Sequence, residues 1–187
     1  MAKTFDKIAL SHRAFIEAQH LFFVATAAAT GRVNTSPKGM DSLRVLGSNR
    51  ILWRNSTGSG NETAGHLRLD PRITLMWCSF GPQPLILRCY GTAKAVHIGE
   101  DGWQAGQALF PADAAARQLV DVTVDLVQTS CGYGVPRMSY EAERPDANTW
   151  VVAKGPEGIV TYWDEVNRTT LDGFATGIEA NLPGRTP

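Results

Sequence analysis

Residues 120–126 alternate strictly between apolar and polar side chains, and this alternation constrains the fold more than any other feature of the sequence. Successive side chains of a β-strand point to opposite faces, so Val120, Val122 and Val124 would share one face. A strand with one buried and one wet face is typical of an antiparallel sheet that covers a single core. The segment therefore predicts an antiparallel β protein.

Further strands are predicted from short apolar runs that are separated by tight turns. Thr30-Gly31 and Ser48-Asn49 supply turn residues, and connections of this length join antiparallel neighbours rather than parallel ones. Gly91 interrupts a long apolar run and marks a bulge or the close approach of another backbone. The predicted strands cover residues 21–29, 32–36, 42–47, 50–55, 72–80 and 85–97, and the first four would form a meander.

Helices are predicted before this β region and inside it. Apolar residues recur at steps of three and four over residues 3–19, as in an amphipathic helix. Asn61 suits the N-cap of a short helix that Asp70-Pro71 would end, and residues 99–119 are expected to be helical. Beyond Gly132, structure is expected only in residues 149–154 and 159–171, and a loose tail in residues 181–187.

Together these elements predict one domain over residues 1–187 that is mainly β with flanking helices. A chain of 187 residues and 20.3 kDa suffices for one core and is short for two. Strands outnumber long helices, which favours an antiparallel barrel or sandwich over a doubly wound sheet. The core would span about residues 20–135, with an N-terminal helix at 3–19 and a C-terminal extension at 136–187.

The charge balance and the cysteines exclude several kinds of partner and compartment. Eighteen basic residues equal eighteen acidic ones and the pI is near 6.9, which gives no electrostatic case for a nucleic acid. No apolar run is long enough to cross a membrane, and the N-terminal residues lack the apolar stretch of a secretory signal. Cys78, Cys89 and Cys131 are odd in number and lack CxxC spacing, so we expect reduced thiols, no metal site and a cytoplasmic protein.

The loop Ser56–Gly60 and the residues after it are the clearest candidate for a ligand site. A polar loop before a helix start can offer backbone N–H groups to a phosphate, and Ser59 and Thr63 would add hydroxyl donors. The segment lacks the GxxxxGK[ST] and GxGxxG patterns, so it is neither a P-loop nor a dinucleotide-binding turn. Taken alone, an ordinary capped surface helix is the simpler explanation.

Basic and aromatic residues on the predicted strands strengthen that candidate. Lys38 and Arg44 lie just upstream of the loop and would bring positive charge to a phosphate, with Arg54 and Arg88 as further candidates. Trp53 could flank a planar ring, although a buried tryptophan is more often a core residue. Each residue alone is explained by a solvated strand face or by the core. Their convergence indicates a ligand that is both anionic and planar.

No side chain is a convincing acid, base or nucleophile. Cys131 follows the best predicted strand, but neither His nor Lys adjoins it in sequence to activate its thiol. The four histidines show no metal-ligand spacing, and neither GxSxG nor HExxH occurs. Reactivity would therefore come from a bound cofactor. The glycines around Tyr133 would allow the backbone to approach such a ligand closely, or would simply end the strand.

Five short segments also occur in an informative order, namely Val33–Gly39, Ser42–Leu46, Ile51–Trp53, Gly58–Thr63 and Asp70–Ile73. In this order they resemble the pyridoxamine 5'-phosphate oxidase-like flavoproteins, above all their oxidase-related branch, over about residues 20–135. The resemblance implies an antiparallel split β-barrel that forms a homodimer and holds FMN between its subunits. It also implies a flavin-dependent oxidoreductase, whose substrate the sequence does not identify.

The same resemblance implies roles for individual residues. True oxidases carry Ser-Arg-Lys where this chain has Asn61-Glu62-Thr63, so two cations are replaced by an acid and a hydroxyl. Phosphate binding would then depend on Lys38, Arg44 and backbone N–H groups. The Trp and Arg-x-His of true oxidases have no clear counterpart after Val135, which puts the oxidation of vitamin B6 phosphates in doubt. The implied cofactor-binding residues are Lys38, Arg44, Val45, Leu46, Trp53, Ser59, Asn61, Glu62 and Thr63, with Arg88, Tyr133 and Val135 completing the site from either subunit.

Three other functions stay open on the sequence. The fold could hold a flavin that is bound but not turned over, as in a carrier or sensor module. The loss of two cations at Glu62 and Thr63 also leaves open a relative that binds a deazaflavin or haem. Finally, the loop at residues 56–60 could be only a turn in a structural domain.

Overall fold

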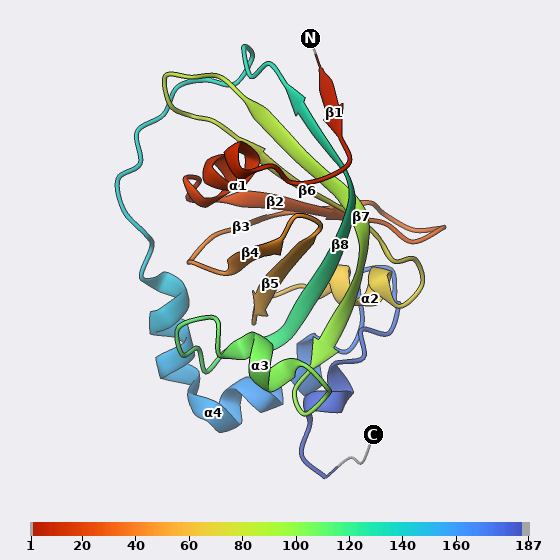
Figure 1. Cartoon of the computed structure of the whole chain (residues 1–187). Coiled ribbons are helices and arrows are strands. Elements are labelled where there is room, and N and C mark those ends of the chain that lie inside the picture. Colours follow the sequence, from red (N-terminus) through yellow and green to blue (C-terminus); the bar gives the residue numbers. More distant parts are fainter. Residues whose placement is uncertain (1, 185–187) are drawn as a thin grey trace.

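The computed structural model describes residues 2–184 and is built around one antiparallel sheet (Figure 1). The strands are β1 (Lys3–Phe5), β2 (Phe22–Thr26), β3 (Asn34–Lys38), β4 (Leu43–Gly47), β5 (Arg50–Ser56), β6 (Arg72–Cys78), β7 (Ile86–His97) and β8 (Ala116–Ser130). The helices are α1 (Leu10–Glu17), α2 (Glu62–Leu67), α3 (Trp103–Gln107), α4 (Asp146–Val166) and the 3-10 helix η1 (Ile178–Asn181). The prediction of a mainly β protein with flanking helices is confirmed.

The sheet is rolled into a barrel that is split between β3 and β4. Its order is β3-β2-β6-β7-β8-β5-β4, with β1 added to β8, so two strands that follow each other in the chain form its two edges. The hairpins β2–β3 and β4–β5 are as predicted, but the four-strand meander is wrong because these hairpins do not pair with each other. Pro37 has no backbone N–H, which suits β3 to an edge.

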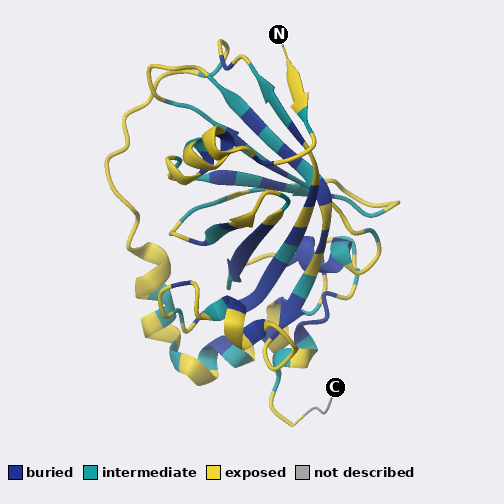
Figure 2. Cartoon of the chain, in the orientation of Figure 1, coloured by how far each residue is buried: buried dark blue, intermediate teal, exposed yellow. Residues whose placement is uncertain are grey.

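The apolar core fills the inside of this barrel (Figure 2). Val120, Val122 and Val124 of β8 point inward and are at most 2% exposed, so the predicted alternation is confirmed. Trp53 and Trp77 are also buried there, and both contact Phe22 as aromatic neighbours. A smaller cluster lies under α3, and another joins α4 to η1.

The N-terminal helix is shorter than predicted. Residues 3–5 form β1, and the helix begins only at Leu10, so the prediction of one helix over residues 3–19 is wrong. Phe5 pairs with Val127 and packs against the barrel core, and Asn49 donates to the carbonyl of Asp6. These tertiary contacts hold the first residues extended although their spacing favours a helix.

The segment before β8 also differs from its prediction. Only Trp103–Gln107 is helical within residues 99–119, because residues from Ala116 onward pair with β5 and β7. Beyond β8 a long strap leads to α4, whose two halves meet in a kink at Gly155 and Pro156. The predicted tail at residues 181–187 begins at the end of η1, and residues 185–187 lie outside the described residues. Within residues 2–184, no helix is long and apolar enough to span a membrane.

Gly91 allows the two longest strands to cross closely, as the sequence predicts. The register of β7 against β8 shifts between Tyr90 and Gly91, which is a bulge. A Cβ atom at Gly91 would lie 1.9 Å from the carbonyl oxygen of Thr123. Because that oxygen belongs to the backbone of a central strand, it has no room to move away.

We therefore expect Gly91→Ala to lower the free energy of unfolding by about 3 kcal/mol, since the methyl group overpacks the β7–β8 crossing. Gly47→Ala is the matched control, because a Cβ atom there meets no described atom within 4 Å. Urea unfolding of both variants tests this. A G91A midpoint equal to that of G47A would contradict the close crossing.

Candidate functional site

A polar cavity of about 350 Å³ lies between β3, the end of β5, the start of β8 and the loop that leads into α2. Five of the predicted cofactor-binding residues meet there: Lys38, Ser59, Asn61, Glu62 and Thr63. The remaining lining residues are Asn34, Ser36, Asn55, Ser56, Thr57, Gly58, Gly60 and Arg117. We call this cavity the cationic pocket, because two of its lining residues, Lys38 and Arg117, are basic.

Strand alternation places Lys38 in the pocket. Asn34, Ser36 and Lys38 share the half-buried face of β3, while the residues between them face outward. The Lys38 ammonium lies 5.3 Å from the ring centroid of Trp53, a favourable cation–π distance. Burial, together with the nearby charge of Arg117, lowers the pKa of Lys38 to about 8.

A β-bulge places Arg117 in the same pocket. Asn55 of β5 pairs with Gln118 and Ser56 pairs with Ala116, so Arg117 has no partner on β5. An extra residue of this kind bends the strand and redirects its side chain. This bulge was not predicted from the sequence, because residues 114–116 are all alanine and favour the helix that we predicted there.

Within residues 2–184, Arg117 is a buried cation that forms no ion pair with an acidic side chain. Its side chain donates to the carbonyl oxygens of Gly58 (3.3 Å) and Gly60 (2.7 Å) and to Oδ1 of Asn167 (2.6 Å). All three acceptors are neutral, and the buried Nε has no partner among residues 2–184. Burial lowers the pKa of Arg117 to about 10. A guanidinium in this state is electrostatically unsatisfied and favours the entry of an anion.

Amide side chains form the floor beside this cation. Asn55 Nδ2 donates to Oε1 of Gln118 (3.0 Å) and Oδ1 of Asn61 (3.4 Å), and Asn61 Nδ2 reaches the carbonyl oxygen of Asn167 at 3.4 Å. Asn61 therefore precedes α2 as predicted, but its side chain makes no N-cap hydrogen bond. The buried Nε2 of Gln118 is a second donor without a partner in the described part of the chain.

Glu62 and Thr63 contribute differently to the pocket. Thr63 is buried at its wall. The Glu62 carboxylate accepts the backbone N–H of Leu171 at 3.0 Å, so this acid is held by the C-terminal segment. The acid that replaces an expected cation thus has a partner of its own.

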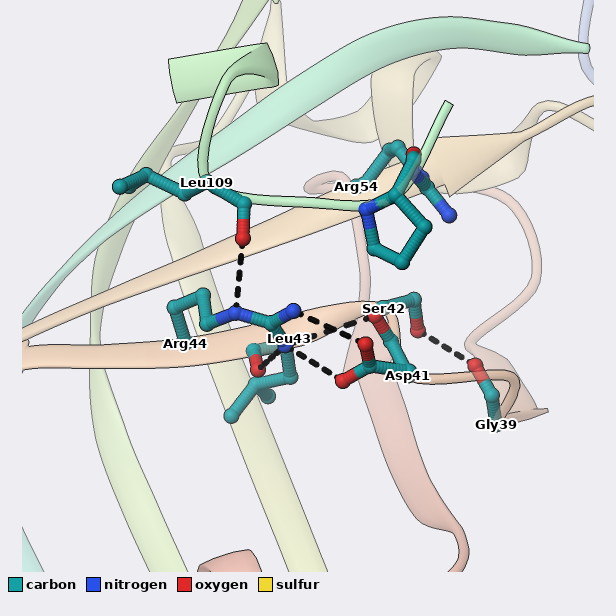
Figure 3. A network of polar contacts seen from close by, with 8 residues as sticks. Gly39, Asp41, Ser42, Leu43, Arg44, Arg54 and Leu109 are labelled. Carbon is teal, nitrogen blue, oxygen red and sulfur yellow. Dashed lines mark hydrogen bonds and ion pairs between the residues drawn. The ribbon is translucent and has the colours of Figure 1, made fainter. Parts of the chain in front are cut away.

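Arg44 is not among the residues of the cationic pocket and lies instead in a separate network of polar contacts, which Figure 3 shows. Its guanidinium forms a two-pronged ion pair with Asp41 and donates to the carbonyl oxygen of Leu109 at 3.0 Å. It also lies 4.7 Å from the ring centroid of Phe110. Arg54 lies 5.2 Å from the ring centroid of the same Phe110 and forms an ion pair with Asp113 at 3.5 Å, so it belongs to this cluster and not to the cationic pocket. In this chain Arg44 therefore fastens the β3–β4 turn to the segment after α3.

The other predicted residues are also distributed outside the pocket. Val45 and Trp53 are core residues, and Leu46 is exposed on β4 beside a separate cavity. Arg88 donates to the Ser130 hydroxyl at the far end of β8 from Arg117. Tyr133 and Val135 follow that same end of β8. Within one chain the structure does not bring these residues to the cationic pocket.

Comparison with known proteins gives one family. The family profile described as pyridoxamine 5'-phosphate oxidase matches residues 10–131. The pyridoxamine 5'-phosphate oxidase family protein ustO of Aspergillus flavus is 36% identical over 135 residues, which cover 70% of this chain and 54% of that protein. The chain thus spans about half the length of this curated relative.

Solved structures support the fold. HupZ from Group A Streptococcus is 20% identical with a TM-score of 0.50, and the match covers 64% of this chain and 91% of HupZ. A candidate pyridoxamine 5'-phosphate oxidase from Lactobacillus delbrueckii is 16% identical with a TM-score of 0.52, covering 66% and 94%. At these identities the likeness is one of fold, and it confirms the predicted split barrel.

The lowered pKa of Lys38 predicts how stability changes with pH. Between pH 8 and 10.5 the unfolded chain binds a proton at Lys38 that the folded chain has lost, so the stability of the unligated protein should rise with pH in this window. Lys38→Met removes this contribution. At pH 7 the variant should have a higher free energy of unfolding than wild type, because it buries no charge at this position, and this difference should shrink as pH rises to 10.5. Denaturant unfolding at several pH values tests this. Lys94→Met is the control, because Lys94 is an exposed lysine on β7. A difference between wild type and K38M that is constant with pH would contradict it.

Proposed function

The chain belongs to the pyridoxamine 5'-phosphate oxidase family, and from this premise we propose that it binds FMN through the cationic pocket and acts as a flavin-dependent oxidoreductase. One observation carries the proposal. The buried guanidinium of Arg117 has an unpartnered Nε and only neutral acceptors among residues 2–184. A phosphate monoester would supply the missing negative charge.

The donors of the pocket suit a phosphate group. Lys38 and Arg117 provide two positive charges, which match the charge of a phosphate monoester near neutral pH. Ser59 and Thr63 add hydroxyl groups, and the loop between β5 and α2 adds backbone N–H groups. Once a phosphate has entered, its negative charge would favour the protonated form of Lys38.

FMN would supply hydride or electron transfer when it is bound. The residues of this chain would bind and orient it: Arg117 and Lys38 fix the phosphate, and the tight β5–α2 loop closes around it. Glu62 is the one acid among the described lining residues, and its carboxylate accepts the Leu171 N–H. The chain's contribution to chemistry is thus positioning rather than acid–base catalysis.

We further propose that two copies of the chain share the site. In one chain, Arg88, Tyr133 and Val135 lie at the opposite end of β8 from the pocket, so only a partner subunit would bring them to a flavin. This arrangement predicts a homodimer with one FMN per protomer. Sedimentation of the FMN-loaded protein tests it, and a monomer with full FMN affinity would contradict the shared site.

The pocket predicts that the phosphate dominates cofactor choice. We expect FMN to bind at least about 100-fold more tightly than riboflavin, because only FMN engages the two cations. Quenching of flavin fluorescence during titration gives both dissociation constants. Equal affinities for FMN and riboflavin would show that the phosphate does not determine cofactor choice. Tighter binding of a deazaflavin or of haem in the same assay would favour a family member that uses another cofactor.

Arg117→Met should weaken FMN binding by about 10- to 100-fold, because one charge-assisted contact to the phosphate is lost. Riboflavin affinity should change little. Arg72→Met, at an exposed arginine that pairs with Asp70, is the matched control and should keep both affinities. Circular dichroism establishes that each variant is folded. An R117M protein that is folded and binds FMN as wild type does would refute the role of Arg117.

A further inference from the structure

The segment after α4 contacts residues of the cationic pocket, although it lies outside the family match at residues 10–131. We propose that Asn167 is a positioning residue that holds the Arg117 guanidinium and the β5–α2 loop in the geometry that a phosphate needs. This inference rests on the proposed function, because it assigns the phosphate of the flavin as the group that Arg117 binds.

Asn167 contacts pocket residues through both polar groups of its side chain and through its backbone carbonyl. It is fully buried, and its side-chain Oδ1 accepts from Nη1 of Arg117 at 2.6 Å. Its Nδ2 donates to the carbonyl oxygen of Gly58 at 3.0 Å. Its backbone carbonyl faces Nδ2 of Asn61 at 3.4 Å. One side chain thus fixes both the cation and the loop whose carbonyl groups hold that cation.

The neutrality of Asn167 is what leaves Arg117 available. A carboxylate at this place would accept the same hydrogen bond, but it would also form a buried ion pair and cancel the charge. An amide orients the guanidinium by its carbonyl oxygen and leaves the positive charge for a ligand. The side chain therefore has the chemistry of a support for an anion site rather than that of a structural salt bridge.

Other contacts join α4 and the segment after it to the β5–α2 loop. Trp163 Nε1 donates to the hydroxyl of Thr57 at 2.7 Å, and the Leu171 N–H donates to the Glu62 carboxylate at 3.0 Å. The Thr176 hydroxyl donates to the carbonyl oxygen of Asn167 at 2.6 Å. The loop is thus held at both of its ends, and the Thr176 hydroxyl in turn holds the backbone carbonyl of Asn167.

The test compares FMN and riboflavin affinities of Asn167→Asp, Asn167→Ala and a control. Asn181→Ala is the control, because Asn181 also joins the C-terminal segment to Arg117 but contacts only its backbone carbonyl. We expect N167D and N167A to weaken FMN binding by at least about tenfold and riboflavin binding by much less. N181A should lower the melting temperature while keeping the ratio of the two affinities. Competition by inorganic phosphate should weaken in parallel with FMN.

The ratio of FMN to riboflavin affinity separates the possible failures. If wild type binds FMN no more tightly than riboflavin, both the proposed function and this inference fail. If wild type discriminates and folded N167D and N167A discriminate equally well, only the role of Asn167 is overturned. If N167A does not fold, N167S replaces it and is judged by the same ratio, because serine keeps a buried polar group without reaching the guanidinium.

Discussion

The positive charge of Arg117 is buried without a counter-ion, and the surrounding structure is organised by that constraint. Desolvation of a guanidinium is costly, and here it is offset only by neutral carbonyl oxygens from Gly58, Gly60 and Asn167. Lys38 adds a second cation nearby, and each disfavours the charge of the other. The two neighbouring cations Lys38 and Arg117 can persist in a folded chain, but only an anion would fully compensate their charge. The bulge in β8, the polar loop after β5 and the C-terminal segment all serve to hold this charge in place.

The split of the barrel supplies the other side of the pocket. Strand alternation on β3 directs Lys38 toward Arg117. Because β3 is also an edge strand, the turn that follows it crosses to the opposite edge, β4. In this turn Met40 and Asp41 both have positive φ values, 61° and 50°, which cost about 1 kcal/mol or more each for residues other than glycine. The ion pair between Asp41 and Arg44 compensates for part of that strain. This explains why Arg44, which resembles a flavin-lining residue of the family, is bound within its own chain.

The elements predicted correctly are those that depend on residues close together in the chain. The two hairpins, the long strands and the bulge at Gly91 follow from turn residues and from alternation, and the pocket residues from Ser59 to Thr63 were found because they are consecutive. Arg117 was missed because its position depends on the register of β8 against β5, which is set by pairing far along the chain. Asn167 was missed for the same reason, since 109 residues separate it from Gly58. The strand at residues 3–5 likewise exists only because β8 offers it an edge.

The departure of Asn61-Glu62-Thr63 from the Ser-Arg-Lys that the family resemblance implies is accounted for by the same geometry. Two cations are absent at the start of α2, and two others, Lys38 and Arg117, reach the pocket from the strands. Glu62 also lines the pocket, and its carboxylate accepts the Leu171 N–H, so it binds the C-terminal segment. Asn61 meets the carbonyl group of Asn167. The residues that replace the cations thus anchor the C-terminal segment, and that segment holds Arg117, which we propose takes their place.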